Sequence, residues 1–295
     1  MQGFLNFYKP QGMSSHDCVG AVRRLLEVKK VGHGGTLDPL AEGVLPIAVG
    51  RATRLLPYLP EGKAYRAVIR FGIATTTDDL EGDVLAQQPA DHLTMEMITA
   101  ALSAFEGTIE QVPPAFSAIQ VQGRRLYDLA RQGKVVTPPA RTVTIHALMM
   151  HHWQPGDQPE LTLDIRCGPG TYIRSIARDL GDRVGTGATL AHLTRTLSGG
   201  FELAHSLSLE TVTERVEQGI LALVDPAAAL SHLPAIALSA DLARRWRQGQ
   251  KFPPPEAIDS DTSYRVITGD PETFLGVAQL EERYEGPILK AKMVL

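Results

Sequence analysis

The stretch that most constrains the fold of this chain is a glycine-rich loop that carries a single carboxylate. It runs from Gly32 to Pro46 and has the sequence GHGGTLDPLAEGVLP. Three glycines in four positions relieve the steric limits on φ, so the backbone can turn tightly and let a ligand come close. Pro39 fixes its own φ and keeps Asp38 out of the helical region. Residues 44–49 are typical of a short buried strand, so we expect a rigid loop beside a sheet.

Two interpretations of Asp38 follow from these residues. An aspartate before proline in a glycine-rich segment is most often a turn residue. A lone carboxylate on a rigid loop also suits an acid that must approach a bulky, flat substrate. The loop lacks the Lys-Ser/Thr ending of a Walker A loop and the glycine spacing of a dinucleotide fingerprint. Both roles of Asp38 therefore stay open, and neither nucleotide motif fits.

Composition indicates an ordinary globular protein without a metal. The 295 residues allow one large or two unequal domains, and 43% hydrophobic with 21% charged residues is typical of a soluble chain. No apolar run approaches a membrane span and no signal core is present, which predicts a cytoplasmic protein. Cys18 and Cys167 form no CxxC pair. His146, His151 and His152 lack the spacing of a metal site.

The charge balance neither requires nor excludes a nucleic-acid partner. A net charge of −4 argues mildly against one, but phosphate binding needs only a local basic face. Basic clusters do occur at Arg23-Arg24 with Lys29-Lys30, at Arg51 with Arg54, and at Arg124-Arg125 with Arg131 and Lys134. Each alone is more typical of a solvated helix face.

Periodicity and caps predict the other elements. Alternation over 63–72 predicts a strand with Tyr65 on its buried face, where a core role would be sufficient. Ser14 and Asp17 form a capping-box pattern that predicts a helix start. Helices are also predicted for 93–105, 123–133, 206–219 and 242–248, and strands for 3–9, 141–153, 160–167 and three runs near the C-terminus.

The segment from Gly168 to Arg174, GPGTYIR, predicts a turn from strand to helix with Thr171 as the N-cap. Arg174 would then lie in the first helical turn, where the helix dipole disfavours a cation. A cation in an unfavourable place indicates an anion nearby, and Asp38 is the obvious candidate. Solvation of Arg174 by water is the alternative.

Beyond these local patterns, residues Gly32 to Arg54 resemble the signature of the TruB family, the tRNA pseudouridine-55 synthases. Further segments resemble the same family: KPxGxSS from Lys9, KxYRA from Lys63, QxPPxFSA from Gln111, GxRxYxxARxG from Gly123 and GxYIR from Gly170. Together they span nearly all of residues 1–200. Gln120 departs from the lysine usual in the family, which puts one phosphate contact in doubt.

The resemblance implies an α+β pseudouridine-synthase fold. Its sheet would be large, mixed and mainly antiparallel, flanked by helices and loops. The catalytic domain would cover 1–230, with an RNA-embracing insertion at about 111–145. A small β-rich PUA-like domain that binds RNA would cover 231–295.

The resemblance also implies roles for individual residues. Asp38 would be catalytic, and Arg174 would hold and orient it. Tyr65 would stack on the target uracil and help to take the proton from C5. Tyr172 would hydrogen-bond around the base.

Two further residues complete the implied site, and each has an ordinary alternative. Leu193 would line the uracil pocket, with helix core as the rival role. His33 would fill the space left by the flipped base or contact the RNA backbone, with loop capping as the rival.

The implied function is isomerisation of uridine to pseudouridine at position 55 in the T arm of tRNA. The expected partner is the T-arm stem-loop, without a metal, an organic cofactor, a guide RNA or an obligate protein partner. Asp38 would act as a covalent nucleophile or assist glycal formation. Three alternatives remain: a non-catalytic tRNA-folding chaperone, an RNA-guided synthase and an enzyme acting on small nucleotides. Retention of the whole set of site residues argues against loss of chemistry.

Overall fold

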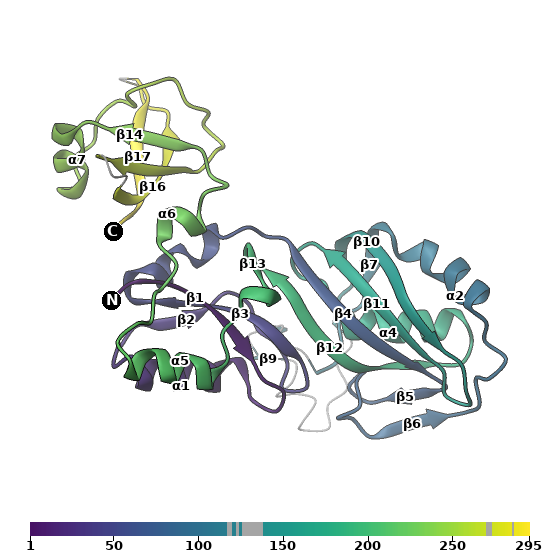
Figure 1. Cartoon of the computed structure of the whole chain (residues 1–295). Helices are drawn as coiled ribbons and strands as arrows, with labels where there is room; N and C mark the ends of the chain where they lie inside the picture. Colours follow the sequence, from purple (N-terminus) through teal and green to yellow (C-terminus); the bar gives the residue numbers. More distant parts are fainter. Residues whose placement is uncertain (117–119, 122–123, 126–137, 270–272, 285) are drawn as a thin grey trace.

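The structure is a computed structural model that describes residues 1–116, 120–121, 124–125, 138–269, 273–284 and 286–295 (Figure 1). The helices are α1 (Ser15–Leu25), α2 (Met95–Leu102), α4 (Ile173–Arg183), α5 (Leu209–Glu217), α6 (Pro226–Ala229) and α7 (Ala240–Arg247), with 3₁₀ segments η1 (Gly50–Tyr58), η2 (Ser103–Phe105) and η3 (Leu203–His205). The strands up to residue 202 are β1 (Gly3–Lys9), β2 (Val31–His33), β3 (Glu42–Val49), β4 (Lys63–Phe71), β5 (Ile73–Thr75), β6 (Val84–Gln87), β7 (Gly107–Gln111), β8 (Gln120–Val121), β9 (Arg124–Arg125), β10 (Arg141–Gln154), β11 (Glu160–Cys167), β12 (Ala188–Ser198) and β13 (Phe201–Glu202). The C-terminal strands are β14 (Ala235–Leu238), β15 (Tyr264–Thr268), β16 (Thr273–Glu281) and β17 (Ile288–Val294).

A nine-stranded sheet organises the larger part of the chain, with the order β1-β3-β12-β4-β11-β10-β7. β2 pairs with β3, and β13 pairs with β12. β12 runs parallel to β3, whereas its other neighbour, β4, is antiparallel to it. The expected large, mixed and mainly antiparallel sheet is therefore confirmed. Because β12 lies between β3 and β4, residues near 195 are brought between residues near 43 and 65.

Helices cover this sheet through their apolar sides. α4 lies against β4 and β12, α2 contacts α4, and one core cluster joins both helices with β4, β11 and β12 (Figure 1). Tyr65 and Phe71 face this core, whereas Arg66 and Arg70 point to the other face, as the alternation predicts. α1 and α5 form a second core with β1 and β3. α1 begins at the predicted capping box of Ser14.

A four-stranded sheet, β14-β15-β16-β17, forms the C-terminal unit, with α7 packed on it. Trp246 of α7 is buried there, and its indole nitrogen donates to the carbonyl of Leu275 at 3.0 Å. Phe274 and Met293 of this unit join a core cluster with Phe4 of β1. The β-rich C-terminal unit is confirmed, while a domain boundary at 230/231 stays a prediction.

Three predicted elements differ from the structure. The helix predicted for 206–219 begins at Leu209, because the Ser208 hydroxyl caps it through the amide of Thr211. The helix predicted from residue 93 begins at Met95, because Thr94 caps it through the amide of Met97, and its last turn is the 3₁₀ segment η2. The helix predicted for 123–133 is wrong at Arg124–Arg125, which pair with β8 as a short strand. The rest of that segment lies outside the described residues.

The pairing of β3 with β12 depends on Gly43. This residue has φ +103°, and it lies directly beside Arg195 in the parallel register. A Cβ at Gly43 would come within 2.9 Å of the Arg195 nitrogen and still closer to its carbonyl oxygen. Both the backbone angle and the close approach require glycine.

We expect Gly43→Ala to lower the free energy of unfolding by about 3 kcal/mol, because it combines a strained φ with overpacking between β3 and β12. Urea denaturation measures this loss. Gly62→Ala is the matched control, since a Cβ at Gly62 meets nothing within 4 Å, and it should change stability by about 0.5 kcal/mol at most. Equal stability of the two variants would contradict this account of the pairing.

Candidate active site

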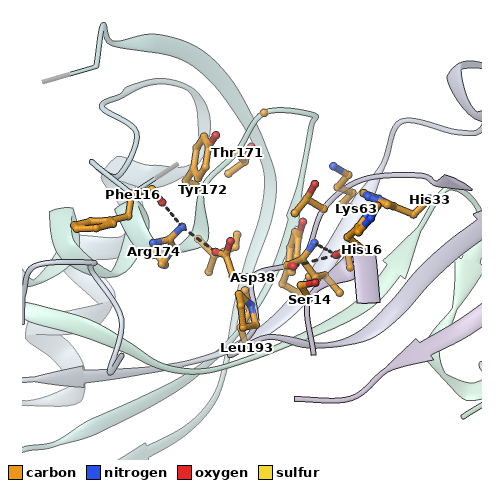
Figure 2. Close-up of a pocket in the computed structure, with 17 residues that line it drawn as sticks. Ser14, His16, His33, Asp38, Lys63, Phe116, Thr171, Tyr172, Arg174 and Leu193 are labelled. Atoms are coloured by element: carbon orange, nitrogen blue, oxygen red, sulfur yellow. Dashed lines mark hydrogen bonds and ion pairs between the residues drawn. The ribbon is translucent and has the colours of Figure 1, made fainter. Parts of the chain in front are cut away.

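The structure brings the six residues singled out from the sequence to one cavity of about 980 Å³ (Figure 2). They are Asp38, Tyr65, Tyr172, Arg174, Leu193 and His33. They come from the loop between β2 and β3, from the strands β2, β4 and β12, and from the start of α4. These elements are distant in sequence, so the sheet order is what assembles the cavity.

Asp38 and Arg174 form the ion pair that the family resemblance implied, and which the helix-dipole argument had left open beside solvation by water. Asp38 Oδ2 lies 2.9 Å from an Nη of Arg174, whose side chain is only 7% exposed, against 44% for Asp38. The other Nη lies 3.5 Å from the buried carboxylate of Asp79. Arg174 also donates to the carbonyls of Thr77 and Phe116, at 2.8 and 3.0 Å. The guanidinium is thus fixed on several sides and presents Asp38 to the cavity, while the catalytic role of Asp38 stays a prediction.

The start of α4 differs from the prediction. Its N-cap is Tyr172, so the assignment of Thr171 is wrong: the Thr171 hydroxyl donates back to the carbonyl of Gly168 at 3.0 Å. The side-chain amide of Gln111 accepts from the Tyr172 N–H at 2.8 Å and donates to its carbonyl at 3.0 Å. The guanidinium of Arg141 lies 5.7 Å from the centre of the Tyr172 ring. A residue from β7, and not a local cap, therefore positions Tyr172.

Tyr65 and Leu193 contribute apolar surface to the cavity from neighbouring strands. Each is 7% exposed, and the register sets Tyr65 opposite Arg195 and Leu193 opposite Ala67. Leu193 lies on a strand, so the helix-core alternative is wrong. Burial raises the pKa of the Tyr65 hydroxyl, while the charge of Arg195 and a hydrogen bond to it act in the opposite direction. Such a surface suits a flat, uncharged ring.

Arg195 holds the loop that carries Asp38, although no role was predicted for it from the sequence. It has no exposed surface and donates to the carbonyls of Val44 at 2.7 Å, Gly35 at 3.0 Å and Thr36 at 3.2 Å. Arginine stays charged when buried, so these carbonyls replace its lost hydration. The sequence did contain a signal for this role: Arg195 lies two positions after Leu193, so a basic residue falls on the same buried face of the strand.

Lys9 and Ser15 hold the other side of this loop. Lys9 is fully buried and donates to the carbonyls of Pro39 at 3.2 Å and Ala41. The Ser15 hydroxyl accepts from the Leu37 N–H at 2.8 Å and donates to the Leu37 carbonyl at 3.0 Å. The KPxGxSS segment thus supports the loop that carries Asp38.

His33 lies on the other side of Asp38 from Arg174, near Lys63 and His16 (Figure 2). Burial lowers the pKa of His33, a backbone hydrogen bond with Gly35 acts in the opposite direction, and the positive charge of Arg195 lowers the pKa further. Its Nδ1 is buried and has no hydrogen-bond partner among the described residues. Lys63 also lines the cavity, and the sequence assigned it no function of its own.

Within the described residues, no three histidine, cysteine or carboxylate side chains converge as a metal site. Over the same part of the chain, no helix is long and apolar enough to cross a membrane.

Two family models match the chain. The one described as TruB family pseudouridylate synthase (N terminal domain) covers residues 23–173, and the one described as pseudouridine synthase II TruB, C-terminal, covers residues 234–285. Curated relatives include the tRNA pseudouridine synthase B of Acaryochloris marina, 54% identical over 100% of this chain and 99% of the relative. That of Gloeothece citriformis is 56% identical over 95% of this chain and 91% of the relative.

Solved structures with a similar fold include a Cbf5-Nop10-Gar1 complex, with a TM-score of 0.75 and 25% identity over 99% of this chain and 84% of that one. An H/ACA RNP bound to a substrate RNA containing 2′-deoxyuridine has a TM-score of 0.74 and 23% identity, over 99% of this chain and 84% of that one.

We expect Arg195→Met to lower the free energy of unfolding by about 2 to 4 kcal/mol, because it leaves three carbonyls without their donor. Hydrogen exchange at residues 34–41 should rise more than exchange in β16. Arg66→Met is the matched control: it removes an exposed guanidinium from the opposite sheet face and should cost about 1 kcal/mol at most. Unchanged exchange in the loop of Arg195→Met would refute its anchoring role.

Proposed function

Because this chain belongs to the TruB family of pseudouridylate synthases, we propose that it converts uridine 55 in the T arm of tRNA to pseudouridine. Its activity as a pseudouridine synthase follows from family membership and from 54% identity over the whole chain. The choice of tRNA is supported by the curated relatives, which are tRNA pseudouridine synthases B. The observation that carries the mechanism is the half-exposed carboxylate of Asp38, 2.9 Å from Arg174.

The reaction is an isomerisation that needs access to both base and sugar. The bond between uracil N1 and ribose C1′ breaks, a bond from C5 to C1′ forms, one proton leaves C5 and one is gained at N1. A uridine stacked in folded RNA exposes none of these atoms, so the nucleotide must be flipped out at a cost of a few kcal/mol. The cavity of about 980 Å³ offers space for the extruded nucleotide.

Asp38 is the group we assign to the sugar. In one route its carboxylate attacks C1′ as N1 departs, and the rotated uracil displaces it through C5. In the other it removes the C2′ proton, a glycal forms as N1 departs, and C2′ regains a proton when C5 adds to C1′. Both routes need a carboxylate fixed in position before the base leaves, and the contacts of Arg174 supply that restraint.

Tyr65 is the group we assign to the base. Its buried ring can stack on uracil, and its hydroxyl can take part in removing the C5 proton. Burial raises the pKa of this hydroxyl and so disfavours the phenolate that would accept a proton. The charge of Arg195 acts in the opposite direction and favours the phenolate. Leu193 would pack against the same uracil, and Tyr172 would hydrogen-bond at its edge. His33 would fill the space that the base leaves in the RNA.

The C-terminal unit is the part we assign to RNA binding outside the cavity, as the PUA-like domain of residues 231–295. α7 presents Arg244, Arg245 and Arg247 in its last turn, and Arg245 lies 5.3 Å from the ring centre of Phe252. The insertion at about 111–145 is only partly described, and its basic segment 126–137 lies outside the described residues. We further propose that the protein acts in the cytoplasm, where tRNA is its substrate.

A guide-dependent reaction is the second candidate, because the fold resembles Cbf5 in a complex with two other proteins. The curated relatives favour the stand-alone enzyme, since they match this chain over nearly their whole length. A folding chaperone without chemistry would have no need for the restrained carboxylate of Asp38.

The test uses a T-arm stem-loop with tritium at uracil C5, incubated with the purified protein and no guide RNA. We expect wild type to release the label and Asp38→Asn to release it about 10³-fold more slowly or not at all, with RNA binding retained.

Asp91→Asn is the control, because Asp91 is an exposed aspartate outside the cavity and its loss should leave the rate unchanged. Tight binding without label release by wild type would exclude a stand-alone synthase. Release by Asp38→Asn at the wild-type rate would remove Asp38 from the mechanism.

A further inference from the structure

Lys63 places an ammonium group at the side of the cavity that the mechanism does not use. It begins β4, two residues before Tyr65, and lines the cavity with His33 and His16 (Figure 2). A methyl group added at Gly35 would meet Lys63 Nζ at 3.4 Å and Arg195 Nη1 at 3.7 Å. The ammonium therefore lies against the glycine-rich loop, close to the buried guanidinium.

Lys63 differs from the other buried or half-buried cations of this site. Arg174 is paired with two carboxylates, and Lys9 and Arg195 donate to backbone carbonyls. Among the described residues, Lys63 has neither a hydrogen bond nor an ion pair. Its ammonium is therefore available to a ligand in the cavity.

The surroundings of Lys63 disfavour its charge in the empty protein. Burial lowers its pKa, the positive charge of Arg195 lowers it further, and Cys167 acts weakly in the opposite direction. His33, beside it, has a buried Nδ1 that no described residue hydrogen-bonds. An anion bound here would relieve the repulsion between like charges and give the ammonium a partner.

The substrate carries its negative charge in one kind of group. Uracil and ribose are neutral, so the full charges of a flipped uridine lie on its two flanking phosphates. A cavity with a carboxylate–arginine pair on one side and a free ammonium on the other matches a nucleotide whose base and sugar face Asp38. Lysine is a common phosphate binder that acts as a point charge.

Resting on the proposed function, we propose that Lys63 binds one of the two RNA phosphates that flank the flipped uridine. The contact would hold the ribose at a fixed distance from Asp38, with His33 beside the same stretch of backbone. Lys63 is thereby a substrate-binding residue, distinct from the groups that act on base and sugar.

The first experiment measures the dissociation constant of the T-arm stem-loop over a range of salt, in an Asp38→Asn background that prevents turnover. We expect Lys63→Met to weaken binding by about tenfold or more and to reduce the salt slope by about one. Lys63→Arg should retain most of the affinity. Arg215→Met, which removes an exposed cation on α5 outside the cavity, should stay within about twofold of its parent.

The second experiment replaces the 5′ or the 3′ phosphate of the target uridine by a neutral methylphosphonate. At one of the two positions the replacement should weaken RNA binding about tenfold in the protein that keeps Lys63. In Lys63→Met the same replacement should weaken binding no further. Additive losses at both positions, or an unchanged salt slope for Lys63→Met, would overturn the contact. Thermal unfolding distinguishes a binding role of Lys63 from a structural one. Lys63→Met should melt at the wild-type temperature or above, because it removes a charge that no described residue pairs with.

Label release by wild type distinguishes the two proposals. Release together with an unchanged salt slope for Lys63→Met would reject the phosphate contact and leave the synthase intact. Absence of release would reject both, since the phosphate contact rests on the reaction.

Discussion

The buried guanidinium of Arg195 is the interaction on which the rest of the site depends. It has no exposed surface, and the carbonyls of Gly35, Thr36 and Val44 take the place of its hydration. A buried charge is tolerated only while those carbonyls stay in position. Moving the loop would leave the cation unsolvated, and this free-energy cost holds the loop in place. The position of Asp38 is therefore set in part by the sheet, through β12, together with Lys9 and Ser15 on the other side of the loop.

The charges around the cavity divide into two kinds. Arg174, Lys9 and Arg195 are satisfied by carboxylates or carbonyls, so they serve as fixed supports. Lys63 has no partner among the described residues and lies on the side away from Arg174. The proposed reaction would use both kinds, because supports would fix the carboxylate of Asp38 and a free cation would supply binding energy.

Sequence patterns succeeded where the governing interaction was local. The capping box at Ser14, the alternation along β4 and the turn at the glycine-rich loop each depend on a few neighbouring residues. The dipole argument pointed to an anion near Arg174, because a cation in a first helical turn is unfavourable wherever the helix lies, but the family motif was needed to choose the ion pair over solvation. The cap of α4 was missed because Thr171 bonds back to Gly168, while Gln111, 61 positions from Tyr172, fixes the backbone of the N-cap residue.

The residues alone predict a rigid acidic loop, a strand carrying Tyr65 and a helix starting near Arg174, and the motifs identify the family. Which charges are satisfied follows only from the packing of distant elements. Arg195 meets Val44 across 151 positions of sequence because β12 inserts between β3 and β4. Local rules of φ and periodicity act over a few residues, whereas desolvation depends on every element packed around a group. That difference is why the sequence could single out Asp38, while the support from Arg195 and the free ammonium of Lys63 emerged only from the packed sheet.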